Sequence, residues 1–244
     1  EEINTIARYL AGLRDFSAEW GTSIEAVSER ELTEEEKREL VSEFRKGVDA
    51  RFDHILADAD SARLERLNEI ESEFKKQSVV LVRGASGQGK SAVCWRFLRN
   101  CCPEGARFRV RYVENARHAM KVANALGSHA KKLRFEATVF LDVSPSEHGW
   151  VELVGELASA GLRVLVSVRE EDFRRSDLTV NRFDFGEVAL ERIDEEEGRR
   201  IYEALTKLSQ GNPLDFDEAW AVFNEADGGP LLEFTHIVTE GQSL

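Results

Sequence analysis

The chain contains 244 residues, 42% of them hydrophobic, and its 33 Lys and Arg against 46 Asp and Glu give a formal net charge of −13. This length allows one large or two modest domains, each able to bury an apolar core. The acidic balance opposes general binding to a nucleic-acid backbone, so we expect no nucleic-acid partner. No apolar run approaches the ~18 residues of a membrane span and no signal-peptide pattern is present, so we expect no membrane partner either.

The cysteines predict a reducing environment. Cys94, Cys101 and Cys102 are odd in number and lack the spacing of metal ligands. Adjacent cysteines point in different directions on a helix, which disfavours a disulfide framework. We therefore expect a cytoplasmic protein. Because the chain begins at Glu1 and its only methionine is Met120, we also expect a fragment truncated at both ends.

The first 76 residues are predicted to be helical. Apolar residues recur at helical spacing over residues 3–16 and again over residues 64–74. Between these stretches, Thr33 followed by Glu36 matches a capping box, and the acidic residues 34–36 suit the positive end of a helix dipole. We assign residues 1–60 to an N-terminal helical region or linker.

Residues 61–190 form the second predicted domain and alternate strands with helices. The predicted strands cover residues 78–83, 106–113, 137–143, 163–168 and 186–190, and the predicted helices cover residues 90–99, 116–126 and 150–160. Gly127 and Gly161 are predicted to end the second and third of these helices. Short apolar strands separated by helices indicate a parallel sheet covered on both faces, which is a three-layer α/β sandwich. Ligands of such sheets bind at the carboxyl ends of the strands.

After residue 190 the strand pattern stops. Asp194 with Glu197 forms a second capping-box pattern, at the start of a helix that we expect to end at Gly211. Another helix is predicted over residues 217–226, and Pro230 suits the first turn of a third. Residues 191–244 are therefore predicted to form a small all-α lid domain.

The segment 84–91, GASGQGKS, fits the phosphate-binding pattern G-x-x-x-x-G-K-[ST] between a predicted strand and a predicted helix, the P-loop arrangement. Its glycines let the backbone turn tightly and aim successive N–H groups at a polyphosphate. Lys90 can reach the outer phosphates, and the Ser91 hydroxyl can ligate Mg²⁺. Residues 61–190 are therefore the predicted P-loop nucleotide-binding domain. The predicted nucleotide-binding residues here are Gly84, Ala85, Ser86, Gly87, Gln88, Gly89, Lys90, Ser91 and Ala92.

A second acid is required beside Ser91 to organise the metal. Asp142 ends an apolar strand in the form of a Walker B carboxylate, so Ser91 and Asp142 are the predicted Mg²⁺ ligands. The next residue is Val143 rather than another acid, and Glu147 is either the catalytic base or an exposed loop residue. Arg169 ends the strand 163–168 and is placed to stabilise charge on a terminal phosphate. The predicted catalytic residues are thus Lys90, Asp142, Arg169 and Glu147.

Three arginines, Arg107, Arg109 and Arg111, alternate along the strand predicted at 106–113. Alternating charges on a strand are usually a solvated face, and we expect these side chains to be exposed.

Together the motifs resemble the nucleotide-binding domain of a STAND NTPase, the group of AAA+ relatives that includes NACHT and NB-ARC modules, and especially the prokaryotic signalling and defence types. The resemblance covers roughly residues 60–244 and runs through segment 84–91, FLD at 140–142, the strand ending in Arg169, and GGPLL at 228–232. It implies that the nucleotide is ATP or ADP, that Arg169 contacts the γ-phosphate, and that Pro230 binds the nucleotide near its adenine or ribose. The absence of an acid at Val143 departs from many members and puts fast hydrolysis in doubt.

The resemblance further implies an ATP/ADP-binding regulatory switch with slow ATP hydrolysis. The nucleotide would bridge the sheet and the lid at rest, and its exchange would permit self-oligomerisation and activation of an effector, with antiphage defence as the implied setting. Effector and sensor domains would lie outside this chain. The alternatives are an AAA+-type motor or loader with rapid hydrolysis, a small-molecule P-loop kinase, and a scaffold that no longer exchanges its nucleotide.

Overall fold

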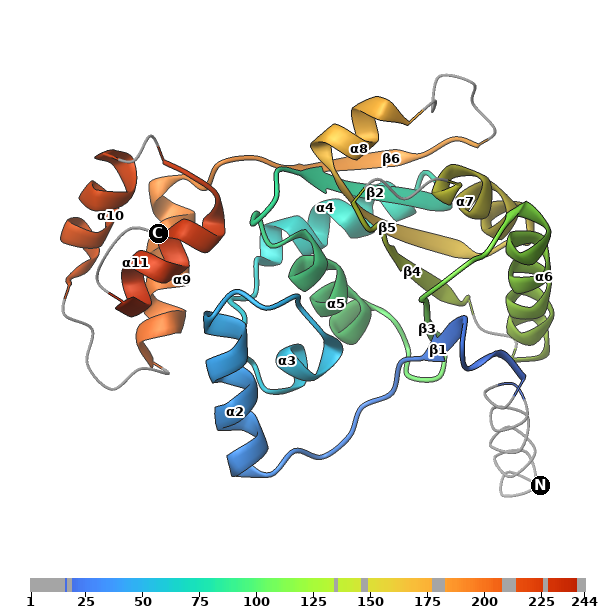
Figure 1. Ribbon diagram of the computed structural model, residues 1–244, viewed down its shortest axis with the longest axis horizontal. Helices are drawn as coiled ribbons and strands as arrows, with labels where there is room; N and C mark the ends of the chain where they lie inside the picture. The colour runs from blue at the N-terminus through green and yellow to red at the C-terminus, as the bar shows by residue number, and fades with distance from the viewer. Residues whose placement is uncertain are drawn as a thin grey trace.

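The computed structural model describes residues 16, 19–133, 136–145, 149–176, 183–207, 214–225 and 228–240. These residues form a mixed α/β fold in which a central sheet carries helices on both faces (Figure 1). The elements in chain order are β1 (Ile24–Ala26), α2 (Glu34–Arg45), α3 (Phe52–Leu56), α4 (Leu64–Phe74), β2 (Val79–Gly84), α5 (Lys90–Cys101), β3 (Arg107–Val110), α6 (Ala116–Leu133), β4 (Thr138–Asp142), α7 (Trp150–Ser159), β5 (Arg163–Arg169), α8 (Glu170–Arg175), β6 (Gly186–Leu190), α9 (Glu195–Lys207), α10 (Phe216–Glu225) and α11 (Leu231–Glu240).

The sheet has the strand order β1-β3-β4-β5-β2-β6. The five strands predicted from the sequence are present, and their pairings with one another are parallel. The sixth strand, β1, pairs antiparallel with β3 and corrects the prediction that the first 76 residues are helical. The sequence did not predict β1 because three residues are too few to show the alternating pattern of a strand. Its pairing with the edge of β3 depends on the tertiary structure.

Alternate residues of the strands enter two separate cores, which confirms the three layers. One core packs α6 and α7 against inward-facing residues such as Leu81, Leu141 and Val166. The other packs α3, α4 and α5 against residues of the opposite face, such as Val82 and Leu165. Because both faces are covered, the strands read as continuous apolar runs rather than as alternating patterns.

Gly127 does not end a helix, contrary to the prediction, because α6 continues from Ala116 to Leu133. A Cβ atom added at Gly127 would lie 3.0 Å from the Cβ of Ala160, at the end of α7. The glycine therefore permits the close packing of α6 on α7 instead of terminating α6. Gly161, by contrast, has a φ of +81° directly after α7, in agreement with its predicted role.

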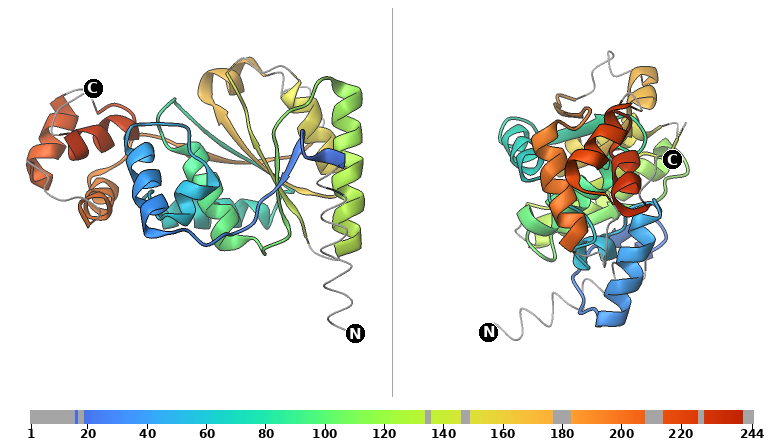
Figure 2. Two further views of the ribbon diagram at one scale, coloured as in Figure 1. Left: turned by 60° about the horizontal axis from the view of Figure 1, so that its bottom comes forward. Right: turned by 90° about the vertical axis from the view of Figure 1, so that its left-hand side faces the viewer.

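The described part of the chain after residue 190 forms three helices, α9, α10 and α11, that pack around an apolar core of their own. Figure 2 shows this helical bundle beside the carboxyl ends of the central strands, next to α2 and α3. Asp194 caps α9 as predicted, accepting a hydrogen bond from Glu197 N at 2.8 Å. Gly211 lies outside the described residues. No helix among the described residues is long and apolar enough to cross a membrane.

Arg107 is buried, which corrects the prediction of an exposed arginine face on β3. Its guanidinium donates hydrogen bonds to the carbonyl oxygens of Arg99 and Cys102 and forms an ion pair with Glu29 at 3.0 Å. Carbonyl groups at the end of a helix lack partners within that helix, and a cation stabilises them. The side chain therefore caps the end of α5 and is removed from solvent by the N-terminal segment.

Candidate functional site

The phosphate-loop segment 84–91 joins β2 to α5, the strand–loop–helix arrangement that the sequence predicts. Gly87 and Gly89 have φ values of +78° and +77°, a conformation that side chains with a Cβ rarely adopt. Gly84 faces a different constraint, because an added Cβ would lie 2.5 Å from the carbonyl oxygen of Leu190 on β6. The three glycines are thus required by local backbone geometry and by close strand packing.

A cavity of about 590 Å³ opens beside this loop at the carboxyl ends of the strands. Its volume is within the range of small-molecule sites. Segments from four parts of the chain contribute to its wall: the loop 47–51, residues 60–63 before α4, the phosphate loop with the ends of β3, β4 and β5, and the helical bundle. Of the predicted nucleotide-binding residues, Ser86, Gly87, Gly89, Lys90, Ser91 and Ala92 line the cavity.

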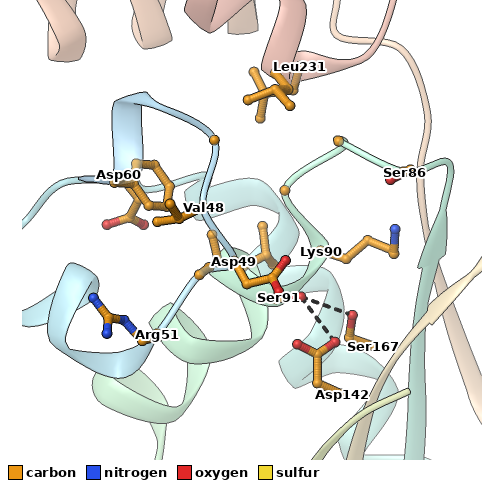
Figure 3. Close-up of a pocket in the computed structure, with 18 of the residues that line it drawn as sticks. Val48, Asp49, Arg51, Asp60, Ser86, Lys90, Ser91, Asp142, Ser167 and Leu231 are labelled. Atoms are coloured by element: carbon orange, nitrogen blue, oxygen red, sulfur yellow. Dashed lines mark hydrogen bonds between the residues drawn. The ribbon is translucent and has the colours of Figure 1, made fainter. Parts of the chain in front are cut away.

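Ser91 and Asp142 meet inside the cavity (Figure 3). The Ser91 hydroxyl donates a hydrogen bond to Asp142 Oδ1 at 3.1 Å and lies 3.5 Å from the hydroxyl of Ser167. β4 and β5 place Asp142 opposite Ser167 in register. Burial raises the pKa of Asp142, while hydrogen bonds from the two serines and the charges of Arg109 and Lys90 act in the opposite direction. The structure brings the two predicted metal ligands together from segments 51 residues apart.

Lys90 is buried and folds back on its own loop, donating a hydrogen bond from Nζ to the carbonyl oxygen of Ala85 at 2.8 Å. Burial lowers the pKa of its ammonium group, and the nearby charge of Arg169 lowers it further. No carboxylate within the described ranges forms an ion pair with Lys90. A buried cation without a counter-ion favours the binding of an anion.

Two arginines at the strand ends add to this positive charge. Arg169 ends β5 beside Gly84 of β2, and its guanidinium forms no ion pair or hydrogen bond with the described residues. Arg109 on β3 also lines the cavity, with its guanidinium 5.5 Å from the ring centre of Trp95. Its nearest carboxylate oxygen, on Glu25, is 3.8 Å away. The sequence analysis expected Arg109 to be solvated. Its place on β3, the strand that pairs with β4, is the feature that indicates a role at the cavity.

Several predicted site residues lie elsewhere. Glu147 is outside the described residues, so its role stays a prediction. Gly84, Ala85 and Gln88 do not line the cavity. Pro230 packs against the phosphate loop, 3.1 Å from a Cβ placed on Gly87, and its neighbours Leu231 and Leu232 line the cavity instead.

Within the described part of the chain, no group of three or more His, Cys, Asp and Glu side chains could hold a metal ion.

The loop 47–51, which sequence analysis did not single out, forms the wall opposite the phosphate loop. Trp95 Nε1 donates a hydrogen bond to the Ala50 carbonyl oxygen at 3.0 Å, and Arg51 N donates to Nδ1 of the fully buried His54 at 3.1 Å. Arg51 also pairs with Glu43. Residues of α5 and α3 therefore hold the loop in place. These contacts join residues that form no recognisable sequence motif, which is why the sequence did not predict them.

The buried imidazole of His54 predicts that stability falls on acidification. Burial lowers its pKa, so the unfolded chain binds a proton near pH 6.5 while the folded protein does not. The free energy of unfolding should therefore fall as the pH drops from 7 through 6.5 toward the lower folded-state pKa, by up to about 1.4 kcal/mol per pH unit. Urea unfolding between pH 7 and 5 measures this slope. His54→Asn keeps an acceptor for Arg51 N and should reduce the dependence of the unfolding free energy on pH. An unchanged slope would show that His54 is not the source of this pH dependence.

No protein-family model and no curated protein matches the chain. Among solved structures, a Walker-type ATPase of Pyrococcus abyssi is similar to it, with 15% sequence identity and a TM-score of 0.49 over 72% of this chain and 69% of that one. At this identity and score, the likeness does not identify a function.

Proposed function

We propose that the cavity binds ATP or ADP together with Mg²⁺, and that the bound nucleotide acts as a regulatory switch with slow hydrolysis. The observation that carries this proposal is the contact between Ser91 and Asp142, 3.1 Å apart in the same cavity as Lys90 and the glycine-rich loop. If segment 84–91 were only a glycine-rich turn, its position beside a carboxylate from a distant strand would be a coincidence. The loop, a cation, a hydroxyl and a carboxylate are the groups that a nucleotide with its metal requires.

The charge around the cavity supports a polyanionic ligand. The whole chain carries a net charge of −13, yet Lys90, Arg109 and Arg169 gather at the strand ends. Arg96 in the same wall is compensated by two aspartates, and Arg109 has a long contact with Glu25 at 3.8 Å, whereas Lys90 and Arg169 form no ion pair with the described residues. Low-dielectric walls strengthen the interaction of the remaining cations with phosphate.

Ser91 and Asp142 would hold Mg²⁺, through the serine hydroxyl and the aspartate carboxylate. The hydroxyl already lies within hydrogen-bond distance of the carboxylate, so both oxygens fit a site for a hard cation that prefers oxygen ligands. When bound, Mg²⁺ would neutralise charge on the outer phosphates. Lys90 would bind those phosphates, and Arg169 would contact the terminal one.

The base and ribose would occupy the part of the cavity between the loop 47–51 and the helical bundle. Val48 from the loop and Ile201, Leu205 and Leu231 from the bundle provide apolar surface there. Adenine is favoured by the resemblance to STAND proteins, and the chain contains no Asn-Lys-x-Asp segment of the kind that reads guanine. The bundle would thus act as a lid that contacts the nucleotide.

A switch is favoured over a rapid ATPase by the residue after Asp142. Val143 is buried and apolar, so it supplies no carboxylate to orient an attacking water. As in the STAND proteins that the motifs resemble, the nucleotide would hold sheet and lid together at rest. Its exchange would permit self-association and activation of an attached effector, and a role in antiphage defence is part of the same proposal.

The experiment identifies the nucleotide and measures its metal dependence. Purified protein is denatured and any released nucleotide identified, and ATP, ADP and GTP are then titrated calorimetrically with and without Mg²⁺. We expect ATP and ADP to bind better than GTP, and Mg²⁺ to increase ATP affinity. Asp142→Asn should reduce that Mg²⁺ effect by about tenfold, which corresponds to about 1.4 kcal/mol.

Two outcomes would contradict the proposal. If neither ATP nor ADP binds, the cavity is not a nucleotide site. If the wild-type protein hydrolyses ATP at about one turnover per second or faster, a value typical of working enzymes, the AAA+-type motor is favoured over the switch.

A further inference from the structure

One buried side chain connects the phosphate loop to the helical bundle. Arg63, just before α4, has a side chain that is only 3% exposed, and its Nε donates a hydrogen bond to Glu197 Oε1 at 2.6 Å. Glu197 lies in the first turn of α9 and its side chain is 10% exposed. A second nitrogen of the same guanidinium, Nη1, donates to the carbonyl oxygen of Gln88 in the phosphate loop at 2.9 Å.

The third nitrogen of Arg63 has no hydrogen-bond partner among the described residues. Nη2 is buried and forms no hydrogen bond within the described part of the chain, although Arg63 belongs to the wall of the cavity. Buried polar nitrogens are nearly always hydrogen-bonded, so the position of this guanidinium depends on its two remaining partners, Glu197 and the Gln88 carbonyl oxygen. Loss of either partner would leave the side chain poorly held beside the phosphate loop.

The helical bundle contacts the same loop residue from the other side. Leu232 N donates a hydrogen bond to the Gly87 carbonyl oxygen at 3.0 Å, and Leu231 N is 3.4 Å from Gln88 Oε1. The first N–H groups of a helix have no partner within it, so the phosphate loop supplies acceptors to the start of α11. Gln88 is therefore held by its carbonyl through Arg63 and by its side chain through α11.

The other side-chain contacts that the described residues show between the bundle and the rest of the protein are less buried. Arg45 donates a hydrogen bond to a backbone carbonyl oxygen of α9 at 3.1 Å, in a partly buried position. Arg200 and Glu65 pair at 3.3 Å, but their side chains are 47% and 69% exposed. Exposed ion pairs contribute little because water screens them. Breaking the buried contact of Arg63 with Glu197 is costly for the opposite reason, since the charge that remains cannot be solvated once its partner is removed.

We propose that Arg63 is a positioning residue that couples the phosphate loop to the docking of the helical bundle, through Gln88 on one side and Glu197 on the other. This coupling rests on the proposed nucleotide site. When the bundle is docked, Glu197 fixes the guanidinium, which fixes the Gln88 peptide and orders the loop for phosphate. Coupling between two equilibria is reciprocal, so a nucleotide in the loop must stabilise the docked bundle by the same factor.

The test compares Glu197→Gln with Glu196→Gln in the full chain. Glu196 is the neighbouring residue of α9, and its side chain is 83% exposed and pairs with Arg200, so its variant is a matched control. Hydrogen exchange of α11, of the phosphate loop and of the central strands is measured with and without ADP and Mg²⁺. ADP affinity is measured in parallel. The central strands provide the internal reference that separates loss of coupling from general destabilisation.

In the wild-type protein and in Glu196→Gln, we expect ADP to slow exchange at the start of α11. In Glu197→Gln, we expect exchange there to be about tenfold faster without nucleotide, ADP protection to be lost, and ADP affinity to fall about tenfold, a typical coupling factor. Exchange of the central strands should not change. Arg63→Met combined with Glu197→Gln should weaken ADP binding no more than Arg63→Met alone, because both changes remove one interaction.

The outcomes separate this coupling from the proposed function. If the wild-type protein binds ADP and Glu197→Gln behaves like Glu196→Gln in affinity and in α11 exchange, the coupling is wrong while the nucleotide site stands. Equal acceleration of exchange in α11 and in the central strands would also overturn it, because that result shows a structural role alone. If the wild-type protein binds no nucleotide, the proposed function fails, and the coupling fails with it.

Discussion

Lys90→Ala is expected to reduce affinity for ATP and ADP by about a hundredfold without unfolding the protein. The ammonium group is buried at the phosphate loop and lacks a counter-ion among the described residues, so phosphate oxygens are its natural partners. A hydrogen bond to a charged group contributes about 1.5–3 kcal/mol, which is about ten- to 150-fold in affinity, and the partly desolvated site favours the upper part of this range.

The same burial predicts the behaviour of Lys90→Ala in the absence of ligand. Burial lowers the pKa of Lys90, which means that the folded protein holds the charged form less favourably than the unfolded chain does. Removing the charge should therefore leave the thermal midpoint nearly unchanged, since relief of the desolvated charge offsets the loss of the hydrogen bond to Ala85 and of the packing of the buried side-chain stem. Calorimetric titration and a thermal scan measure both effects. Lys76→Ala, at an exposed lysine paired with Glu73, is the control and should bind ATP normally.

A large fall in thermal midpoint for Lys90→Ala would contradict this account, because it would assign the lysine a structural role. Undiminished affinity for both nucleotides would remove Lys90 from the site.

The core of the candidate site could be predicted because its residues come from local patterns placed by a simple topology. The glycine-rich segment 84–91, Asp142 and Arg169 each follow an apolar strand, and parallel strands bring their carboxyl ends to one edge of the sheet. No long-range information was needed to expect these groups in one place. The observed contact of Ser91 with Asp142 and the pairing of Gly84 with Arg169 follow from that arrangement.

The remainder of the site depends on strand register and on packing between distant segments. Ser167 reaches Ser91 because β4 and β5 pair Asp142 with Ser167, a register that the sequence does not specify. Arg109 has the same pattern as its solvated neighbour Arg111, and only its place beside Asp142 distinguishes it. The contact of Arg63 with Glu197 joins residues 134 apart in sequence, one just before α4 and one in the first turn of α9, and neither position has a sequence pattern that predicts the pairing.

Gly84→Ala is expected to destabilise the fold by about 3 kcal/mol, at the upper end of the cost of over-packing. The added Cβ would lie 2.5 Å from the Leu190 carbonyl oxygen and 3.3 Å from its Cβ. The first of these contacts is with backbone, so relief requires the ends of β2 and β6 to separate. For a protein of this size, about 3 kcal/mol lowers the thermal midpoint by roughly 6–12 °C, which a scanning calorimeter resolves readily.

Gly161→Ala is the matched control, because it tests a glycine required by conformation instead of contact. Its φ is +81° and an added Cβ would meet nothing within 4 Å, so the cost is limited to backbone strain of about 1–2 kcal/mol. Gly84→Ala should therefore be clearly the less stable of the two, and it should also bind ATP more weakly, since separation of β2 from β6 displaces the start of the phosphate loop. Equal stability of the two variants would show that β6 moves away at little cost. In that case the first glycine of the motif would be required by the nucleotide rather than by the sheet.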